Sequence, residues 1–274
     1  MNTRIQTLLQ QVYSAQVAES LRLRIEERMQ TVKRESTREE RWSASDILFI
    51  TYPDAFQGGD GSPLTNLRDV LRNLFSEHIS IVHVLPFYPY TSDDGFSVSN
   101  YRVVDASLGS WADIKGLSED VQLMFDLVIN HASSDHPFFQ DFLADRAPGN
   151  RYFFTASEDA DVSGVTRPRA SPLLQTYQTA AGPKQVWCTF SRDQVDWDFS
   201  NPDVLFEFVD VFLTYIERGA TWMRIDAIAY LWKELGTPCI HLPQTHAVVK
   251  LLRAIADATS SDIKLLTETN VPLE

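Results

Sequence analysis

Residues 121–131 read VQLMFDLVINH, and this stretch decides the class of fold. Its first nine residues are a mostly apolar run with one carboxylate, Asp126, inside it. Apolar strands of this kind are typical of a parallel sheet that helices cover on both faces. The stretch ends on the polar pair Asn130 and His131. Since ligands bind at the carboxyl ends of parallel strands, these side chains are candidates for a site.

Similar segments occur before and after this stretch, and segments with helical periodicity separate them. Strands are predicted at 46–51, 78–85, 121–129, 221–225 and 263–267. Helices are predicted at 64–75, 202–217 and 245–259, with one or two amphipathic helices within 3–40. Strands that alternate with helices predict an α/β protein built on a parallel sheet.

One long segment departs from this alternation. Residues 132–198 are rich in proline and aromatic side chains but have weak periodicity. The segment is too long for a plain crossover and too aromatic for disorder. We therefore expect an inserted subdomain at 132–198, a helical extension at 1–44, and one sheet-and-helix unit formed by 45–131 and 199–274.

The composition is that of a globular protein with a sizeable core: 274 residues, 44% hydrophobic and 22% charged. The formal net charge of -13 repels polyanions, so neither nucleic acid nor a membrane is an expected partner. The sequence contains neither an apolar run of about 20 residues nor a signal-peptide core, and a cytoplasmic protein is expected. Cys188 and Cys239 are too few for a disulfide framework.

Two further polar motifs fall where predicted strands end. Residues 222–226 read WMRID, and since side chains two apart on a strand share a face, Arg224 can hold Asp226 ionised. Residues 265–270 read LLTETN and place Glu268 at the same edge. One ionised and one protonated carboxyl on neighbouring strands suit a retaining glycosidic mechanism. Each motif taken alone also fits a structural role, as a buried ion pair or a surface acid.

The motifs DLVINH (126–131), MRIDAI (223–228) and TETN (267–270) occur in this order, with a long insertion after the first. Together they resemble the α-amylase superfamily, glycoside hydrolase family 13. Within it, FYPYTSDDGFSV (87–98) and TRPRA (166–170) resemble the sucrose phosphorylase subfamily. The resemblance implies the N-terminal part of a TIM (β/α)8 barrel, about five strands, with a B subdomain inserted after the third strand.

The resemblance implies the chemistry of a retaining α-glucoside phosphorylase. Asp226 matches the nucleophile that forms a covalent glucosyl-enzyme, and Glu268 matches the acid/base. Inorganic phosphate is the co-substrate that takes the glucosyl group, and α-D-glucose 1-phosphate is the product. Hydrolases and transglucosylases of the same family share both residues and stay open as alternatives.

The substrate-binding residues are also implied by the resemblance. Asp93, His131 and Arg224 match residues that bind the glucosyl ring. Phe96 matches an apolar platform beside the sugar, and Arg169 a position used for phosphate on the acceptor side. The chemistry of Arg169 fits this role, because a guanidinium fork suits phosphate. A chain of net charge -13 also needs a local cation where phosphate binds. An acidic turn at Asp93 and a surface charge at Arg169 are the alternatives.

One departure from the subfamily concerns the substrate. Sucrose phosphorylases usually carry a histidine two residues after the acid/base glutamate, where this chain has Asn270. The strings TETNVP (267–272), SDDGFSV (92–98) and GTPCIHL (236–242) look more like the glucosylglycerate phosphorylase branch. Glucosylglycerate is therefore the expected donor, and sucrose or sucrose 6-phosphate is the alternative.

The chain ends at Glu274, soon after the fifth predicted strand. We therefore expect the N-terminal portion only of a family chain. An open half barrel exposes apolar faces and a free sheet edge, so a homodimer is expected. A non-catalytic sugar-binding fragment is the alternative from another class. No organic cofactor and no metal are expected, although Asn130 matches a calcium ligand of some amylases.

Overall fold

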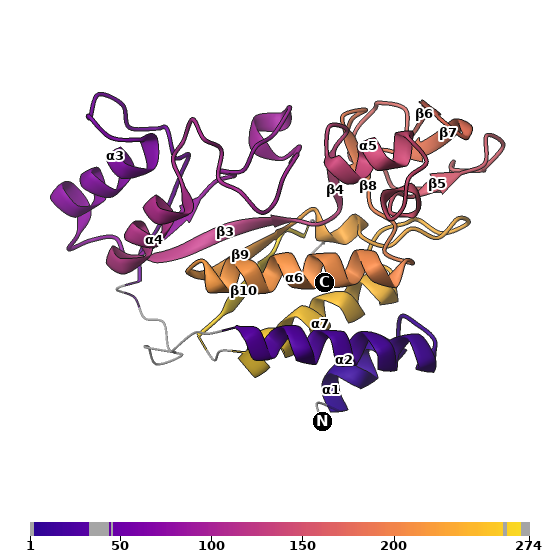
Figure 1. The fold of residues 1–274 in the computed structure, drawn as a ribbon, viewed down its shortest axis with the longest axis horizontal. Coiled ribbons are helices and arrows are strands. Elements are labelled where there is room, and N and C mark those ends of the chain that lie inside the picture. The colour runs from indigo at the N-terminus through magenta and orange to yellow at the C-terminus, as the bar shows by residue number, and fades with distance from the viewer. Residues whose placement is uncertain (1–2, 33–43, 45, 260–261, 270–274) are drawn as a thin grey trace.

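The computed structural model describes residues 3–32, 44, 46–259 and 262–269. At its centre lies a parallel sheet (Figure 1). In the order of their pairing, its strands are β1 (Leu48–Thr51), β2 (Ile81–Val84), β3 (Gln122–Val128), β9 (Ala220–Asp226) and β10 (Lys264–Thr267). Every pairing is parallel, so all carboxyl ends meet at one edge. The predicted α/β class and the five predicted strands are confirmed.

Helices connect and cover the strands (Figure 1). The α-helices are α1 (Thr3–Gln10), α2 (Ala15–Thr31), α3 (Pro63–Val70), α4 (Trp111–Asp120), α5 (Pro137–Leu143), α6 (Pro202–Glu217) and α7 (Pro243–Thr259). A π-helical turn at Leu71–Phe75 continues α3, and short 3-10 turns lie at Asp93–Gly95, Gly149–Arg151 and Ile228–Tyr230. The predicted helices at 64–75, 202–217 and 245–259 are thus all present.

Helix α4 is one element that the apolar pattern did not predict. Its apolar face is short, with Ile114 and Leu117 buried against the core. The local signal is a capping box instead: Ser110 caps the helix, and the Asp113 carboxylate accepts from the Ser110 backbone N–H at 2.8 Å. Such a box satisfies amide groups that the first helical turn leaves free.

The N-terminal helices pack on the outside of the layer formed by α6 and α7 (Figure 1). Arginines of α2 tie the two layers together: Arg24 pairs with Asp203 at 2.7 Å, and Arg28 pairs with Asp210 and Glu217 of α6. Helices were expected within 3–40, and the structure places them at Thr3–Gln10 and Ala15–Thr31. The remainder of that range lies mostly outside the described residues.

Leu21 of α2 provides a test of this packing. Its side chain is 1% exposed, whereas that of Leu23 in the same helix is 55% exposed. We expect Leu21→Ala to lower the free energy of unfolding by about 2–5 kcal/mol, because it leaves a cavity between the layers. Leu23→Ala, the matched control, should change it by less than about 0.5 kcal/mol. Urea unfolding measures both, and equal effects would contradict the packing described.

The segment expected to form an insertion lies beyond the carboxyl end of β3 (Figure 1). Strand β4 (His131–Ser133) pairs antiparallel with β8 (Gln194–Asp196). Strands β5 (Thr155–Ala156), β6 (Leu174–Thr179) and β7 (Gly182–Trp187) form a small antiparallel sheet in the order β5-β7-β6. The weak periodicity of the segment did not predict these strands, since most of their residues are half-buried or exposed. The domain boundaries stay a prediction.

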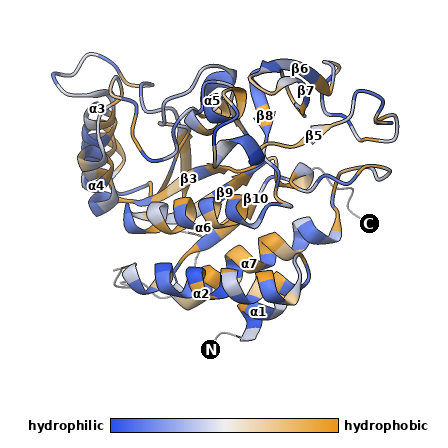
Figure 2. Ribbon diagram, turned by 45° about the vertical axis from the view of Figure 1, so that its right-hand side comes forward, coloured by the Kyte–Doolittle hydropathy of each residue, from blue (hydrophilic) through white to orange (hydrophobic). Residues whose placement is uncertain are grey.

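The outer strands are less buried than the central ones. Residues Leu48 and Ile50 of β1 are 42% and 56% exposed, and Leu266 of β10 is 48% exposed. Hydrophobic residues run along the sheet and the helices next to it (Figure 2). The apolar runs predicted strands covered on both faces, which holds for β3, whereas the exposed residues of the two outer strands are those that an open half barrel predicts. Each of them pairs with only one neighbour within the described residues, so the sheet stays open there.

Candidate active site

The parallel register brings the predicted site residues to one edge of the sheet. Val128, the last residue of β3, lies opposite Asp226, and Ile225 lies opposite Thr267 of β10. Glu268 follows directly, and its backbone N–H donates to the Ile225 carbonyl oxygen at 3.1 Å. Asp226 and Glu268 are therefore neighbours at the carboxyl ends of adjacent strands.

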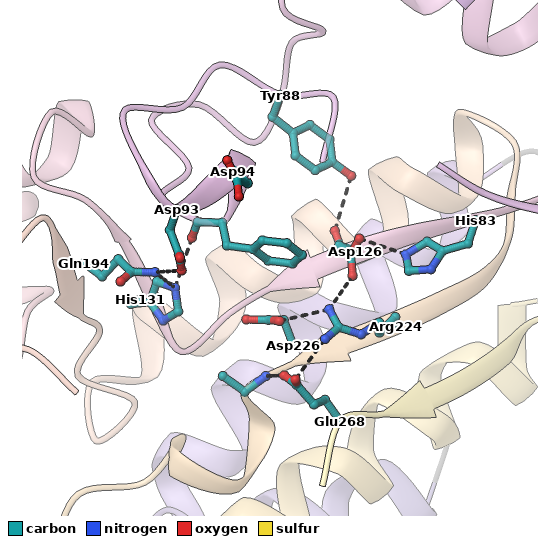
Figure 3. A network of polar contacts seen from close by, with 12 residues as sticks. His83, Tyr88, Asp93, Asp94, Asp126, His131, Gln194, Arg224, Asp226 and Glu268 are labelled. Atoms are coloured by element: carbon teal, nitrogen blue, oxygen red, sulfur yellow. Dashed lines mark hydrogen bonds and ion pairs between the residues drawn. The ribbon is translucent and has the colours of Figure 1, made fainter. Parts of the chain in front are cut away.

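Arg224 connects the carboxylates at this edge (Figure 3). Its Nη1 lies 2.7 Å from Asp126 Oδ1 and 2.9 Å from Asp226 Oδ1, and its Nη2 lies 3.0 Å from Glu268 Oε1. Asp126 is fully buried, and its second oxygen lies 2.8 Å from His83 Nε2. A single guanidinium thus orients three carboxylates, and its own position is fixed by a buried His–Asp pair.

The electrostatics of Asp226 correct an expectation. Burial raises the pKa of Asp226 to about 8, the charge of Glu268 also raises it, and Arg224 lowers it. Arg224 was expected to keep this carboxylate ionised. The guanidinium is shared between several carboxylates, so it does not offset the cost of removing the Asp226 carboxylate from water. Burial and the charge of Glu268 thus favour the protonated form of Asp226.

A second cluster lies beside the first and includes three more of the predicted residues (Figure 3). His131, which is 1% exposed, has its Nε2 3.0 Å from the Phe96 carbonyl oxygen. Gln194 donates to Asp93 Oδ2 at 2.7 Å. The Phe96 ring centre lies 5.5 Å from Arg224 Cζ, within cation–π distance. Phe96 thus connects the two clusters.

A strained turn presents the Asp93 side chain. Asp93 and Asp94 both have left-handed backbones, with φ values of 55° and 50°, which aspartate tolerates better than most residues. Gly95 follows at φ 104°, and a Cβ there would lie 2.7 Å from the Pro86 side chain. Only glycine fits this position, and the strain is of the kind found at functional sites.

A small pocket lies beside Glu268. Its volume is about 70 Å³. It is lined by Pro168, Phe190, Ala227, Ala229, Tyr230, Ile240 and Glu268. The Ala227 backbone, left-handed at φ 48°, donates its N–H to Glu268 Oε2 at 2.8 Å. Glu268 therefore contacts Arg224 of the first cluster and also lines this pocket.

Residues 50–273 match the family model described as the catalytic domain of α-amylase. The chain belongs to the α-amylase family. A glucosylglycerate phosphorylase of Spirochaeta thermophila is 51% identical over 228 residues, which are 83% of this chain and 39% of that protein. A glucosylglycerate phosphorylase of Escherichia coli is 40% identical over 275 residues, which are 99% of this chain and 49% of that protein.

Among solved structures, the crystal structure of sucrose 6F-phosphate phosphorylase from Thermoanaerobacter thermosaccharolyticum is similar to this one. The TM-score is 0.75 at 29% identity, and the match covers 84% of this chain and 49% of that chain. The expected fold, the N-terminal part of an α-amylase-family TIM barrel, is confirmed. The chain spans half or less of the length of these relatives.

The α-amylase-family site gathers all but one of the residues that the sequence singled out. Asp226, Glu268 and Arg224 form one cluster, and Asp93, Phe96 and His131 the other. Their roles stay predictions. Arg169 does not join them: it is exposed, and within the described residues its guanidinium makes no ion pair. Its neighbour Pro168 does line the pocket beside Glu268. Asn270 lies outside the described residues.

Several residues of the site were missed by the sequence analysis. Gln194 lies within the segment of weak periodicity, and only the β4–β8 pairing brings it to Asp93. His83 is a polar residue inside the apolar strand IVHV, one strand before Asp126, and such a position indicates a candidate site residue. Lys233, in an otherwise apolar stretch, is buried beside Asn130. None of the described helices is long and apolar enough to span a membrane.

Proposed function

We propose that this chain carries the donor-side half of the active site of a retaining α-glucoside phosphorylase, with glucosylglycerate as the favoured donor. The observation that supports it most is the placing of Asp226 and Glu268 on the two arms of the Arg224 guanidinium, at 2.9 and 3.0 Å. A retaining reaction needs two carboxyl groups that lie close together and flank the bond to be broken, with the nucleophile on the face opposite the leaving group. The names of the relatives favour glucosylglycerate over sucrose.

In the proposed first step, an Asp226 oxygen attacks the anomeric carbon. The bond from that carbon to the glycerate oxygen breaks with its electron pair on oxygen, and Glu268 gives its proton to this oxygen. The product is a glucosyl ester of Asp226. Arg224 stabilises Asp226 as the anion that attacks, while Asp93 and His131 bind ring hydroxyls and Phe96 contacts the apolar face of the sugar.

In the proposed second step, a phosphate oxygen attacks the same carbon. The bond to Asp226 breaks and restores its carboxylate, and Glu268 takes the proton from phosphate. α-D-Glucose 1-phosphate leaves, and two inversions retain the anomeric configuration. The raised pKa of Asp226 supplies the pair with one proton at neutral pH. Donor binding must place this proton on Glu268 before attack.

The acceptor side needs a positive charge, because glycerate and phosphate are both anions. The pocket beside Glu268 has no cation among the described residues that line it. Arg169 is the next residue after Pro168 of that lining, and the loop is held by a bond from the Thr166 N–H to the Pro238 carbonyl oxygen at 2.9 Å. We therefore assign phosphate binding to Arg169.

Arg169→Ala should raise the KM for phosphate by about tenfold or more while the KM for the donor changes little, because a charged hydrogen bond to one substrate is lost. Arg146→Ala is the matched control, since Arg146 is an exposed arginine of the same segment that pairs with Asp141. Steady-state kinetics in both substrates measure this. An equal change in both KM values would return Arg169 to a surface role.

The function is tested by following glucose 1-phosphate from glucosylglycerate and from sucrose, each with phosphate. The chain is assayed alone and fused to the part of the Spirochaeta relative that it does not match. We expect phosphate-dependent release from glucosylglycerate, exceeding release from sucrose. Release of free glucose that does not depend on phosphate would indicate a hydrolase instead. Sugar binding without product in both forms would favour a binding module.

The remaining expectations concern partners. The exposed apolar residues Leu48, Ile50 and Leu266 support self-association of this chain through the open sheet, so a homodimer stays a proposal that sedimentation can test. The expected lack of an organic cofactor and of a metal, and the cytoplasmic location, stay predictions.

A further inference from the structure

Lys233 is a buried cation outside the catalytic pair. Its side chain is 1% exposed, and its Nζ lies 2.7 Å from Asp196 Oδ2 and 2.9 Å from Asn130 Oδ1. The Leu231 carbonyl oxygen accepts at 3.4 Å. The three ammonium hydrogens thus have three acceptors. These come from β8, from the end of β3 and from the segment after β9.

The ammonium determines the orientation of the Asn130 amide. Only the carbonyl oxygen of Asn130 can face Lys233, since two donors would repel. The Asn130 amide nitrogen then faces Asp196 Oδ2 at 3.0 Å, where only a donor is acceptable. Thr189 fixes the Asp196 carboxylate in turn, through its N–H at 2.9 Å and its hydroxyl at 2.6 Å. Asn130 therefore has one allowed orientation.

That orientation selects a tautomer of His131. The Asn130 amide nitrogen lies 3.3 Å from His131 Nδ1, so Nδ1 must accept and the ring proton sits on Nε2. Nε2–H then donates to the Phe96 carbonyl oxygen at 3.0 Å. In the Nδ1–H tautomer, Nε2 could accept from the Gln194 amide nitrogen at 3.2 Å. However, Nδ1–H would then face the Asn130 amide donor, and Nε2 would face the Phe96 carbonyl oxygen, so that donor meets donor and acceptor meets acceptor. The contacts favour the Nε2–H form.

Burial and the charge of Lys233 both disfavour the charged form of His131. Burial lowers the pKa of His131, the charges of Asp196 and Asp93 oppose this, and Lys233 acts in the same direction as burial. Without the charge of Lys233, the buried Asp196 carboxylate would raise the pKa of His131 with no nearby ammonium to oppose it. Lys233 thus has a second, electrostatic effect on the same ring.

We propose that Lys233 is a positioning residue of the donor site, whose ammonium orients Asn130 and thereby holds His131 as the neutral Nε2–H tautomer. Its donor is then directed to the side of Asp93 and Phe96. That the glucosyl ring binds there rests on the proposed function, but the tautomer does not. Because the tautomer of the neutral imidazole is already fixed, no free energy is spent on selecting it when the sugar binds.

Long-range proton–nitrogen NMR spectra of the 15N-labelled chain distinguish the two tautomers and the imidazolium, and His131→Gln assigns the signals. We expect the Nε2–H form in the parent chain. Asn130→Asp, which has the same shape, puts an acceptor against Nδ1 and should convert His131 mainly to the imidazolium or the Nδ1–H form. Lys250→Met, an exposed lysine of α7, is the control and should change nothing.

The charge of Lys233 is tested in two variants. Lys233→Met removes one of the two groups that orient Asn130 and should raise the pKa of His131, while Asp196 still accepts from the Asn130 amide nitrogen. If that variant does not fold, the double variant Lys233→Met with Asp196→Asn removes both charges of the pair and should mix the tautomers in a folded chain. An unchanged Nε2–H form in folded Asn130→Asp and in the double variant would overturn the proposal. Since the spectra need no turnover, this failure is separate from a failure of the phosphorylase assay.

Discussion

Asp226→Asn should lower glucosyl transfer to phosphate by a factor on the order of 10⁴ or more, because asparagine keeps the shape but cannot form the glucosyl ester. The measurement is the rate of glucose 1-phosphate release, with glucosylglycerate as donor, in whichever form of the chain is active. Residual activity within about tenfold of the parent would remove Asp226 from the role of nucleophile.

The same substitution has an effect on stability whose sign follows from the raised pKa. Burial raises the pKa of Asp226 from 3.8 to about 8, so the folded chain holds a proton that the unfolded chain releases. This contribution is fully present below the unfolded pKa and is lost as pH rises from about 4 towards 8.

Asparagine cannot ionise, so Asp226→Asn should unfold with a weaker pH dependence than the parent. The free energy of unfolding of the variant minus that of the parent should therefore be larger at pH 8 than at pH 4, by on the order of a few kcal/mol. Urea unfolding at both pH values gives this difference directly. Parallel pH profiles for parent and variant would show that Asp226 is not protonated in the folded chain.

Glu268→Gln is expected to have the second largest effect. Loss of the general acid should lower turnover of glucosylglycerate by a factor on the order of 10³. An α-glucosyl fluoride should form the glucosyl-enzyme with a much smaller loss, because fluoride leaves without a proton. Glu234→Gln, an exposed glutamate on the segment after β9, is the matched control. Equal losses with both donors would mean that Glu268 is not the acid.

This variant also tests the electrostatic link between the two carboxyls. The charge of Glu268 contributes to the raised pKa of Asp226. Replacing it with glutamine should therefore move the acidic limb of the kcat/KM profile, measured with the fluoride, to lower pH. A limb that does not move would show that the charge of Glu268 does not raise the pKa of Asp226.

Much of the fold could be predicted from the sequence because the central strands are local features. The runs 78–85 and 121–129 are apolar enough to predict strands without knowledge of their neighbours, and β2 and β3 lie within them. Motif spacing likewise predicted that Asp226 and Glu268 lie at one edge. Helix α4 was missed because its apolar face is short, so the capping box at its start carried the signal.

The sequence by itself determined the class of fold, the family and the residues of the proposed catalytic pair, since these depend on patterns within short segments. Only the tertiary structure decided the raised pKa of Asp226 and the buried contacts of Lys233. Lys233 is 103 residues from Asn130, and Gln194 is 101 residues from Asp93. Burial and hydrogen-bond geometry arise from packing between such distant segments, and no local pattern encodes them.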